Sequence, residues 1–194
     1  MGAQDPDSTL RRTHSEVAIP GPGHDDRPRS PRGPDLPTWQ HNGVASWEEF
    51  EAAQPEFAER VRARFTVRKH CTLATLRRDG SPRISGTEVA FEDGELLLGM
   101  MPGSVKARDL RRDARLALHS PTEDTSENDS SSWAGEAKIA GRAIEVTDPK
   151  RATEGHRFRV EITEVVLTWV GEPADHLLIE SWHPERGLQL RERR

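Results

Sequence analysis

The 194-residue sequence has little of what several classes of protein require. It contains one cysteine, which excludes a framework of intramolecular disulfide bonds. No stretch approaches the roughly 18 apolar residues that a membrane helix needs, and no apolar run of a secretory leader follows the first residues. The net charge of -5 gives no overall positive field to collect phosphates. We therefore expect a soluble protein of the reducing cytoplasm, with neither a membrane nor nucleic acid as its partner.

Apolar residues are also scarce, because 33% of the residues are hydrophobic and 31% are charged. Such a composition predicts that part of the chain does not fold. Seven of the 14 prolines lie between Pro6 and Pro37, mixed with glycine, serine, aspartate and arginine. A segment of this kind cannot bury enough apolar surface to offset the entropy lost on ordering. We predict a disordered tail over residues 1–45 and one folded domain over residues 46–194.

The folded domain is predicted to begin with two helices. Ser46 and Glu49 form a capping-box pattern, in which each side chain can accept a hydrogen bond from a backbone N–H of the first turn. Aromatic and aliphatic residues then recur at steps of three and four up to Phe65, interrupted by Pro55. Because proline is tolerated in the first turn of a helix, the pattern predicts one helix to about residue 54 and a second over 55–65. Their apolar stripe is expected to pack against the domain body.

From His70 onward the hydrophobic pattern is typical of strands. Two Asp-Gly pairs, at residues 79–80 and 93–94, predict tight hairpin turns between the first three strands. The predicted strands cover residues 71–76, 82–91, 95–101, 114–120, 134–147, 157–170 and 175–182. Sequential antiparallel strands with small-residue bends at Gly86 and Gly141 favour a closed or partly closed barrel over an open sheet. The expected fold is a mainly β, split β-barrel of six to seven antiparallel strands with peripheral helices.

The stretch from Gly99 to Asp113 is the one that most resembles a binding site. A strand pattern runs into a Pro-Gly turn, and Ser104 opens an amphipathic helix. The first backbone N–H groups of a helix have no partner within it, so they and the helix dipole favour a nearby anion. Ser104 can add a hydroxyl and Lys106 a positive charge. The spacing alone favours the alternative, an ordinary N-cap serine followed by solvated basic residues, because serine is common at N-cap positions.

No other cluster of side chains predicts chemistry by itself. His70 and Cys71 are neighbours on a strand and therefore face opposite sides, so a thiol with an adjacent base is not expected, and Cys71 is predicted to be buried. The histidines lack the spacing of metal ligands. We therefore predict no catalytic side chain and no metal site.

Three segments together resemble the pyridoxamine 5'-phosphate oxidase-like flavoproteins, the FMN-binding split-barrel family. They are Leu73 to Ser85, the triplet Ser104-Val-Lys106, and Leu110 to Leu118. Their order and spacing make the resemblance specific, and it covers roughly residues 47–189. The resemblance implies a homodimer that binds FMN, or deazaflavin F420 in some branches, in clefts at the subunit interface.

The resemblance also implies roles for strand residues. Arg83 matches the arginine that starts the second strand and approaches the flavin phosphate. Ile84 and Ser85 match positions that run under the isoalloxazine ring and offer backbone hydrogen bonds. Gly99 and Met100 match the pair at the end of the third strand, beside the ring or the ribityl chain.

The helix start and a late tryptophan complete the implied cofactor-binding set. Ser104 and Lys106 match the Ser-x-Lys that grips the phosphate, which agrees with the anion site inferred from the residues themselves. Val105 occupies the middle position, where the oxidases proper often have arginine, so one phosphate contact is absent. Trp182 is placed where an aromatic ring can cap the flavin from the partner subunit, with core packing as the alternative.

The function implied is that of an FMN-dependent oxidoreductase acting on a small molecule. The substrate stays open, because Glu88 stands where the oxidases carry a lysine and the C-terminal residues lack their Arg-Leu-x-Pro element. The alternatives are an F420-dependent reductase and a non-enzymatic protein that holds flavin or haem. All three functions need the phosphate-binding residues or the cleft. None needs a catalytic side chain, because a flavin carries the electron chemistry itself.

Overall fold

A computed structural model describes residues 43–124, 130–146 and 155–194 of the chain. The predicted disordered tail lies outside the described residues, apart from its last three positions. Within those three, Ala45 is 3% exposed, and its backbone N–H and carbonyl both bond to Ile162. The sequence predicts that the domain starts at Ser46, but its packing already includes Ala45.

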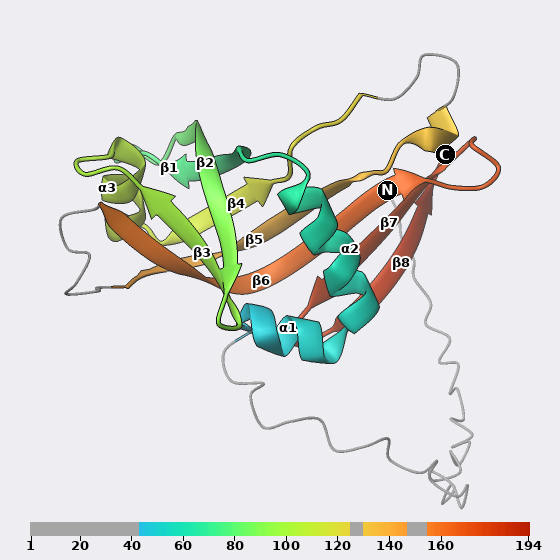
Figure 1. Ribbon diagram of the computed structural model, residues 1–194, viewed down its shortest axis with the longest axis horizontal. Helices are drawn as coiled ribbons and strands as arrows, with labels where there is room; N and C mark the ends of the chain where they lie inside the picture. Colours follow the sequence, from blue (N-terminus) through green and yellow to red (C-terminus); the bar gives the residue numbers. More distant parts are fainter. Residues whose placement is uncertain (1–42, 125–129, 147–154) are drawn as a thin grey trace, which may run out of the picture. The chain divides into compact units, whose positions relative to one another are not determined.

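Six strands close into an antiparallel barrel (Figure 1). The neighbour order is β3-β2-β1-β4-β5-β6, and an additional pairing of β3 with β6 closes the ring. The barrel strands are β1 (Cys71–Leu76), β2 (Pro82–Glu92), β3 (Glu95–Met100), β4 (Arg115–His119), β5 (Glu136–Glu145) and β6 (His156–Val170). The mainly β barrel expected from the alternating pattern and the Asp-Gly turns is confirmed.

Strand β6 is shared between the barrel and a two-stranded extension. Its first half pairs with β3, and its second half pairs with β7 (Leu177–His183), which in turn pairs with β8 (Gly187–Arg193). The sequence prediction lacked β8, because that segment has only Leu188 and Leu190 as apolar residues and both are exposed. A strand that buries so little leaves a weak pattern, and its pairing with β7 is what holds it in place.

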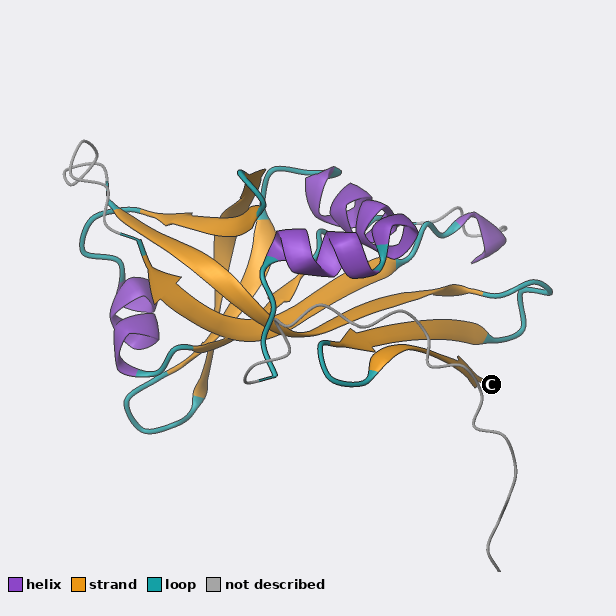
Figure 2. Cartoon of the chain, turned by 90° about the horizontal axis from the view of Figure 1, so that it is seen from below, coloured by secondary structure: helices purple, strands orange, loops and turns teal. Residues whose placement is uncertain are grey.

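Two helices cover the side of the sheet where β3, β5 and β6 lie, and a third lies at the other end of the barrel (Figures 1 and 2). They are α1 (Trp47–Ala53), α2 (Pro55–Thr66) and α3 (Val105–Arg112). The capping box at Ser46 is present, with Ser46 and Glu49 exchanging both hydrogen bonds. The apolar stripe is buried as predicted, with Trp47, Phe50 and Phe65 at most 1% exposed. None of the helices in the described ranges is long and apolar enough to cross a membrane.

Cys71 opens β1 and is 3% exposed, with its Sγ 3.7 Å from the carbonyl oxygen of Phe65. Burial raises the pKa of its thiol to about 11. Since the thiolate is the reactive form of cysteine, the native thiol is expected to be inert.

We predict that a thiol-specific disulfide reagent leaves Cys71 unmodified in the native protein at about pH 8, near the pKa of an ordinary thiol. The same reagent should modify one thiol per chain in denaturant, as read by mass spectrometry. Rapid labelling of the native protein would contradict the burial of this side chain.

Candidate functional site

The turn from β3 into α3 leaves several polar groups without a partner in the helix. Ser104 occupies the N-cap position, but its hydroxyl makes no hydrogen bond to the first turn. The N–H groups of the first turn, which include those of Val105 and Lys106, have no intrahelical acceptor by the geometry of an α-helix. The strand, turn and helix start predicted from the sequence are therefore present, and their donors remain available to a ligand.

These groups face a cavity of about 1100 Å³, which we call the cofactor cavity. Its walls come from β2, β3, the 101–104 turn, the first turn of α3 and the start of β6. Five of the nine residues predicted to bind the cofactor line this cavity: Gly99, Met100, Ser104, Val105 and Lys106. The part of the prediction that rests on the helix start and the end of β3 thus converges on one place.

Lys106 carries the positive charge that the anion site requires. Its ammonium group donates a hydrogen bond to the carbonyl oxygen of Gly86 on β2. Burial lowers the pKa of Lys106 below its ordinary value, and the nearby charge of Glu88 partly opposes that shift. The direction shows a cation that is partly desolvated, and an anionic ligand would favour its charged form.

The two arginines that line the cofactor cavity are already paired with carboxylates. Arg111 holds both carboxylate oxygens of Glu145 at 2.6 and 2.7 Å, and Arg157 contacts Glu92 at 2.5 Å. Among the described residues, Lys106 has no carboxylate at ion-pairing distance. Of the described lysine and arginine side chains that line this cavity, Lys106 is therefore the one whose charge remains available to a ligand.

The floor of the cavity includes bare backbone at Gly86 and Gly99. These glycines lie on the adjacent strands β2 and β3, where Glu88 pairs with Gly99. A Cβ atom added at either glycine would meet no heavy atom within 4 Å, so the space above both is open. A flat ring can rest against such a surface and bond to its backbone groups. The residues present thus fit a planar group that carries a phosphate.

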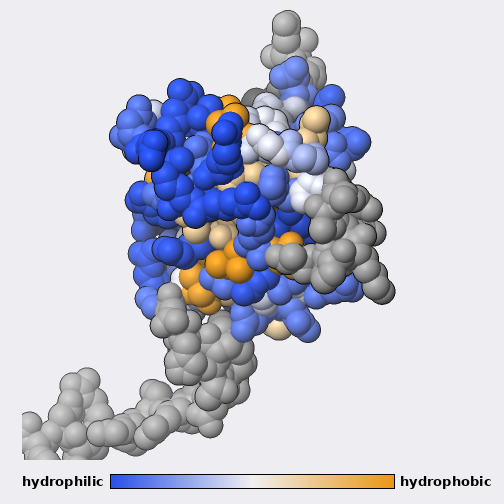
Figure 3. Space-filling view, turned by 90° about the vertical axis from the view of Figure 1, so that its left-hand side faces the viewer, coloured by the Kyte–Doolittle hydropathy of each residue, from blue (hydrophilic) through white to orange (hydrophobic). Residues whose placement is uncertain are grey.

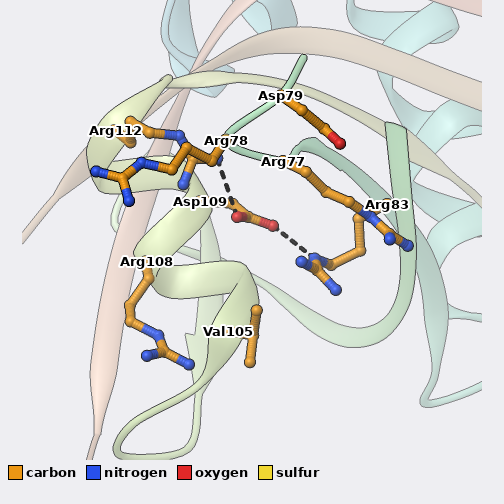
Figure 4. A pocket seen from close by; sticks show the side chains of 8 residues that line it. All are labelled: Arg77, Arg78, Asp79, Arg83, Val105, Arg108, Asp109 and Arg112. Atoms are coloured by element: carbon orange, nitrogen blue, oxygen red, sulfur yellow. Dashed lines mark hydrogen bonds and ion pairs between the residues drawn. The ribbon is translucent and has the colours of Figure 1, made fainter. Parts of the chain in front are cut away.

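Arg83 does not line the cofactor cavity. Its Nε donates to Oδ2 of Asp109 at 2.6 Å, and it lines a second cavity of about 670 Å³, which we call the arginine hollow (Figure 4). Val105 lines both cavities. Their predicted shared role at a phosphate requires Arg83 and Lys106 to line the same cavity. They line different cavities, because the carboxylate of Asp109 on α3 holds the guanidinium of Arg83.

The other three predicted residues line neither cavity. Ile84 is 75% exposed and Ser85 is half-buried on β2. Trp182 is 2% exposed in the core, with its ring 4.8 Å from that of Phe50. Its pairing on β7 with Val165 of β6 and the cover of α1 direct the ring inward, so the alternative of core packing is the arrangement observed.

Sequence analysis missed several residues that line the cofactor cavity. Gly86 was interpreted as a bend in a strand, and Glu88 as a departure from the family pattern. Arg111, Glu145 and His156 come from three separate elements, and no local motif joins them. Only the antiparallel pairing of the barrel brings them together.

In the parts of the chain that the structure describes, no group of three or more histidine, cysteine, aspartate or glutamate residues could hold a metal ion.

A six-stranded antiparallel barrel with a cleft beside the β3–α3 turn defines the split-barrel class. The sequence model of the pyridoxamine 5'-phosphate oxidase family matches residues 57–178, more than half of the chain. The protein therefore belongs to that family. No curated protein matches the sequence.

Solved structures agree with the fold. A pyridoxamine 5'-phosphate oxidase-related, FMN-binding protein from Nostoc punctiforme matches with a TM-score of 0.51 and 11% identity, over 73% of this chain and 96% of that one. PhzG from Burkholderia lata matches with a TM-score of 0.50 and 13% identity, over 75% and 92% of the two chains. These likenesses show the architecture, since both identities are low.

Proteins of this fold hold more than one kind of cofactor. A haem-binding protein from Mycobacterium smegmatis matches with a TM-score of 0.50 and 18% identity, over 66% of this chain and 57% of that one. The solved structures of this fold thus include an FMN-binding protein and a haem-binding protein.

Asp109 fixes the position of α3 beside both cavities. Its side chain is 4% exposed and accepts hydrogen bonds from Thr75, Arg83 and Arg112 at 3.1, 2.6 and 3.0 Å. Burial by itself raises the pKa of Asp109, but these hydrogen bonds outweigh it and lower the pKa below its ordinary value.

We predict that Asp109→Asn lowers the free energy of unfolding by about 1–3 kcal/mol near neutral pH, since it removes a charged acceptor from a buried cluster. Because the folded-state pKa is lowered, the carboxylate stabilises the fold above its unfolded-state pKa, about 4, and this contribution is lost as the pH falls through the folded-state pKa. Urea unfolding of both proteins across this range measures the difference. If the difference in free energy of unfolding between the wild type and Asp109→Asn grew as the pH fell, the role of the carboxylate would be contradicted.

Proposed function

We propose that this protein is an FMN-dependent oxidoreductase that acts on a small molecule. The observation that carries the proposal is Lys106, a partly desolvated cation without a carboxylate partner among the described residues, at a helix start that faces a cavity of about 1100 Å³. Membership of the pyridoxamine 5'-phosphate oxidase family supports the choice of FMN. When bound, the flavin supplies the electron chemistry of the reaction.

The residues of the chain would bind and orient the cofactor. Lys106, the hydroxyl of Ser104 and the first N–H groups of α3 would hold the phosphate, as charge-assisted hydrogen bonds and helix N-termini do for anions. Gly86 and Gly99 would leave room for the ring to approach the backbone of β2 and β3. Val105 would contribute an apolar contact in place of a third positive charge.

The substrate would meet a cluster of paired charges in the lining of the cavity. Arg111, Glu145 and His156 lie within hydrogen-bonding distance of one another there, with Nη2 of Arg111 3.2 Å from Nδ1 of His156. Such a group can donate to and accept from a polar substrate without a change in net charge. We therefore favour a small polar molecule as the substrate.

We also propose that the protein is a homodimer with the cofactor at the interface. Ile84 and Met101 are 75% and 79% exposed, and Val105 is 44% exposed, although all three are apolar. Ile84 lies on the same face of β2 as Gly86, since strand residues two apart share a face. A second copy of the chain would cover this apolar rim of the cavity and complete its wall.

We predict that the purified protein binds FMN, seen as quenching of flavin fluorescence on titration. Lys106→Ala should weaken FMN binding by about tenfold or more, the effect of one charge-assisted hydrogen bond, while the unfolding transition stays in place. Lys138→Ala is the matched control, because Lys138 is an exposed lysine of β5 that lines neither cavity.

The absorption spectrum of the protein as purified distinguishes FMN from F420 and haem, and mass spectrometry of the released molecule identifies it. Bleaching of a bound flavin by a nicotinamide donor, followed by recovery with an acceptor, supports an enzyme. A bound flavin that never passes electrons to any acceptor contradicts the oxidoreductase and leaves a binding protein.

We predict that Ile84→Glu converts the dimer to monomers in sedimentation experiments, because it places a charge in the apolar rim. The same variant should lose FMN affinity if the partner completes the cavity. Leu190→Glu is the control, since Leu190 is a 58% exposed leucine of β8 outside both cavities. A wild-type protein that sediments as a monomer at all concentrations would exclude the interface.

A further inference from the structure

The arginine hollow concentrates positive charge in a chain whose net charge is -5. Five arginines and two aspartates line it, and Figure 4 shows their side chains around Asp109. The arginines come from β2, from the turn that joins β1 to β2, and from α3: Arg77, Arg78, Arg83, Arg108 and Arg112. The lining of this hollow therefore carries a net charge of +3, opposite in sign to that of the protein.

Asp109 positions two of these guanidinium groups without using all of their donors. Arg83 reaches the carboxylate through Nε, and Arg112 reaches it through Nη2. No described residue accepts a hydrogen bond from the two terminal nitrogens of Arg83. The guanidinium of Arg83 is thus fixed by an ion pair with a buried carboxylate and still offers its two terminal nitrogens as donors, which suits a phosphate or carboxylate.

Two further arginines have no carboxylate of their own. Among the described residues, neither Arg78 nor Arg108 has an acidic partner at ion-pairing distance. Asp79 balances part of the charge of the turn. Hydrogen bonds from the hydroxyl and the backbone N–H of Ser81 lower the pKa of its carboxyl, and the charge of Arg77 lowers it further. Like charges held together repel each other, and an anion between them relieves that repulsion.

The hollow is distinct from the cofactor cavity. Val105 separates them on the first turn of α3, with Lys106 on the side of the cofactor cavity and Arg108 on the side of the hollow. The end of the molecule that carries α3 is largely hydrophilic on its surface (Figure 3). Its volume of about 670 Å³ has room for a small molecule.

We propose that the arginine hollow is a second anion site, which binds a small molecule that carries at least two phosphate or carboxylate groups. Arg78 from the turn and Arg108 from α3 bind it from two sides, and the free nitrogens of Arg83 bind it from the floor. A single monovalent anion would neutralise one of these groups only, which is why the site selects a ligand of higher charge.

Isothermal titration calorimetry with inorganic pyrophosphate tests the proposal on the full chain at low salt, where exposed charges are screened least. One pyrophosphate should bind per chain. The double variant Arg78→Gln/Arg108→Gln should weaken binding by about tenfold or more, since each lost charge-assisted hydrogen bond is worth roughly that factor. It leaves the buried pairs of Asp109 intact, so its unfolding transition should match that of the wild type.

The matched control is Arg68→Gln/Arg191→Gln, which removes two exposed arginines that line neither cavity. This control should keep the wild-type affinity for pyrophosphate. Lys106→Ala should also keep the wild-type affinity for pyrophosphate, because Lys106 belongs to the other cavity. This measurement does not depend on whether FMN binds.

Three outcomes would overturn the proposal. The first is the absence of pyrophosphate binding at low salt, and the second is an equal loss of affinity in the double variant and its control, which would indicate a diffuse surface charge. The third is competition between pyrophosphate and FMN, or loss of pyrophosphate binding in Lys106→Ala, either of which would place the anion in the cofactor cavity. Failure of FMN to bind would refute the proposed function and leave this result unaffected.

Discussion

The carboxylate of Asp109 is the interaction on which the rest of the binding region depends. This buried carboxylate joins Thr75 of β1, Arg83 of β2 and Arg112 of α3 in one hydrogen-bonded cluster. A buried carboxylate that lost these partners would be costly, so the cluster holds α3 against the barrel at a fixed rotation. The first turn of α3 then faces the turn after β3, and both cavities take their shape from that placement.

The rotation of α3 also divides its charges between two surfaces. Each residue of a helix adds about 100° around the axis, so Lys106 and Arg108, two positions apart, lie about 200° apart and face opposite sides. Val105 lies at the border and lines both cavities. An amphipathic helix of eight residues thus presents Lys106 and Arg111 to the cofactor cavity and Arg108 and Arg112 to the arginine hollow.

The features that could be predicted from the sequence are those set by neighbouring residues. The capping box at Ser46, the Asp-Gly hairpins and the helix start at Ser104 each depend on a few adjacent side chains, and the structure has them where the sequence placed them. The inward direction of Trp182 depends on α1, more than a hundred residues earlier in the chain, and on a strand partner. Strand β8 depends on its pairing with β7 rather than on a pattern of its own. No local signal encodes such contacts.

The same distinction explains which of the predicted site residues lie together. Ser104 and Lys106 line one cavity because the β3–α3 turn carries them as a unit. Arg83 lies apart from them, since the direction of its side chain is set by Asp109, which lies 26 residues further along the chain. With Arg83 held there and valine at position 105, the cofactor cavity retains Lys106 as its one unpaired lysine or arginine among the described residues. A phosphate in that cavity would therefore depend on the backbone donors of α3 more than the family pattern implies, because the one guanidinium that the pattern assigns to it, that of Arg83, is held by Asp109 at the arginine hollow.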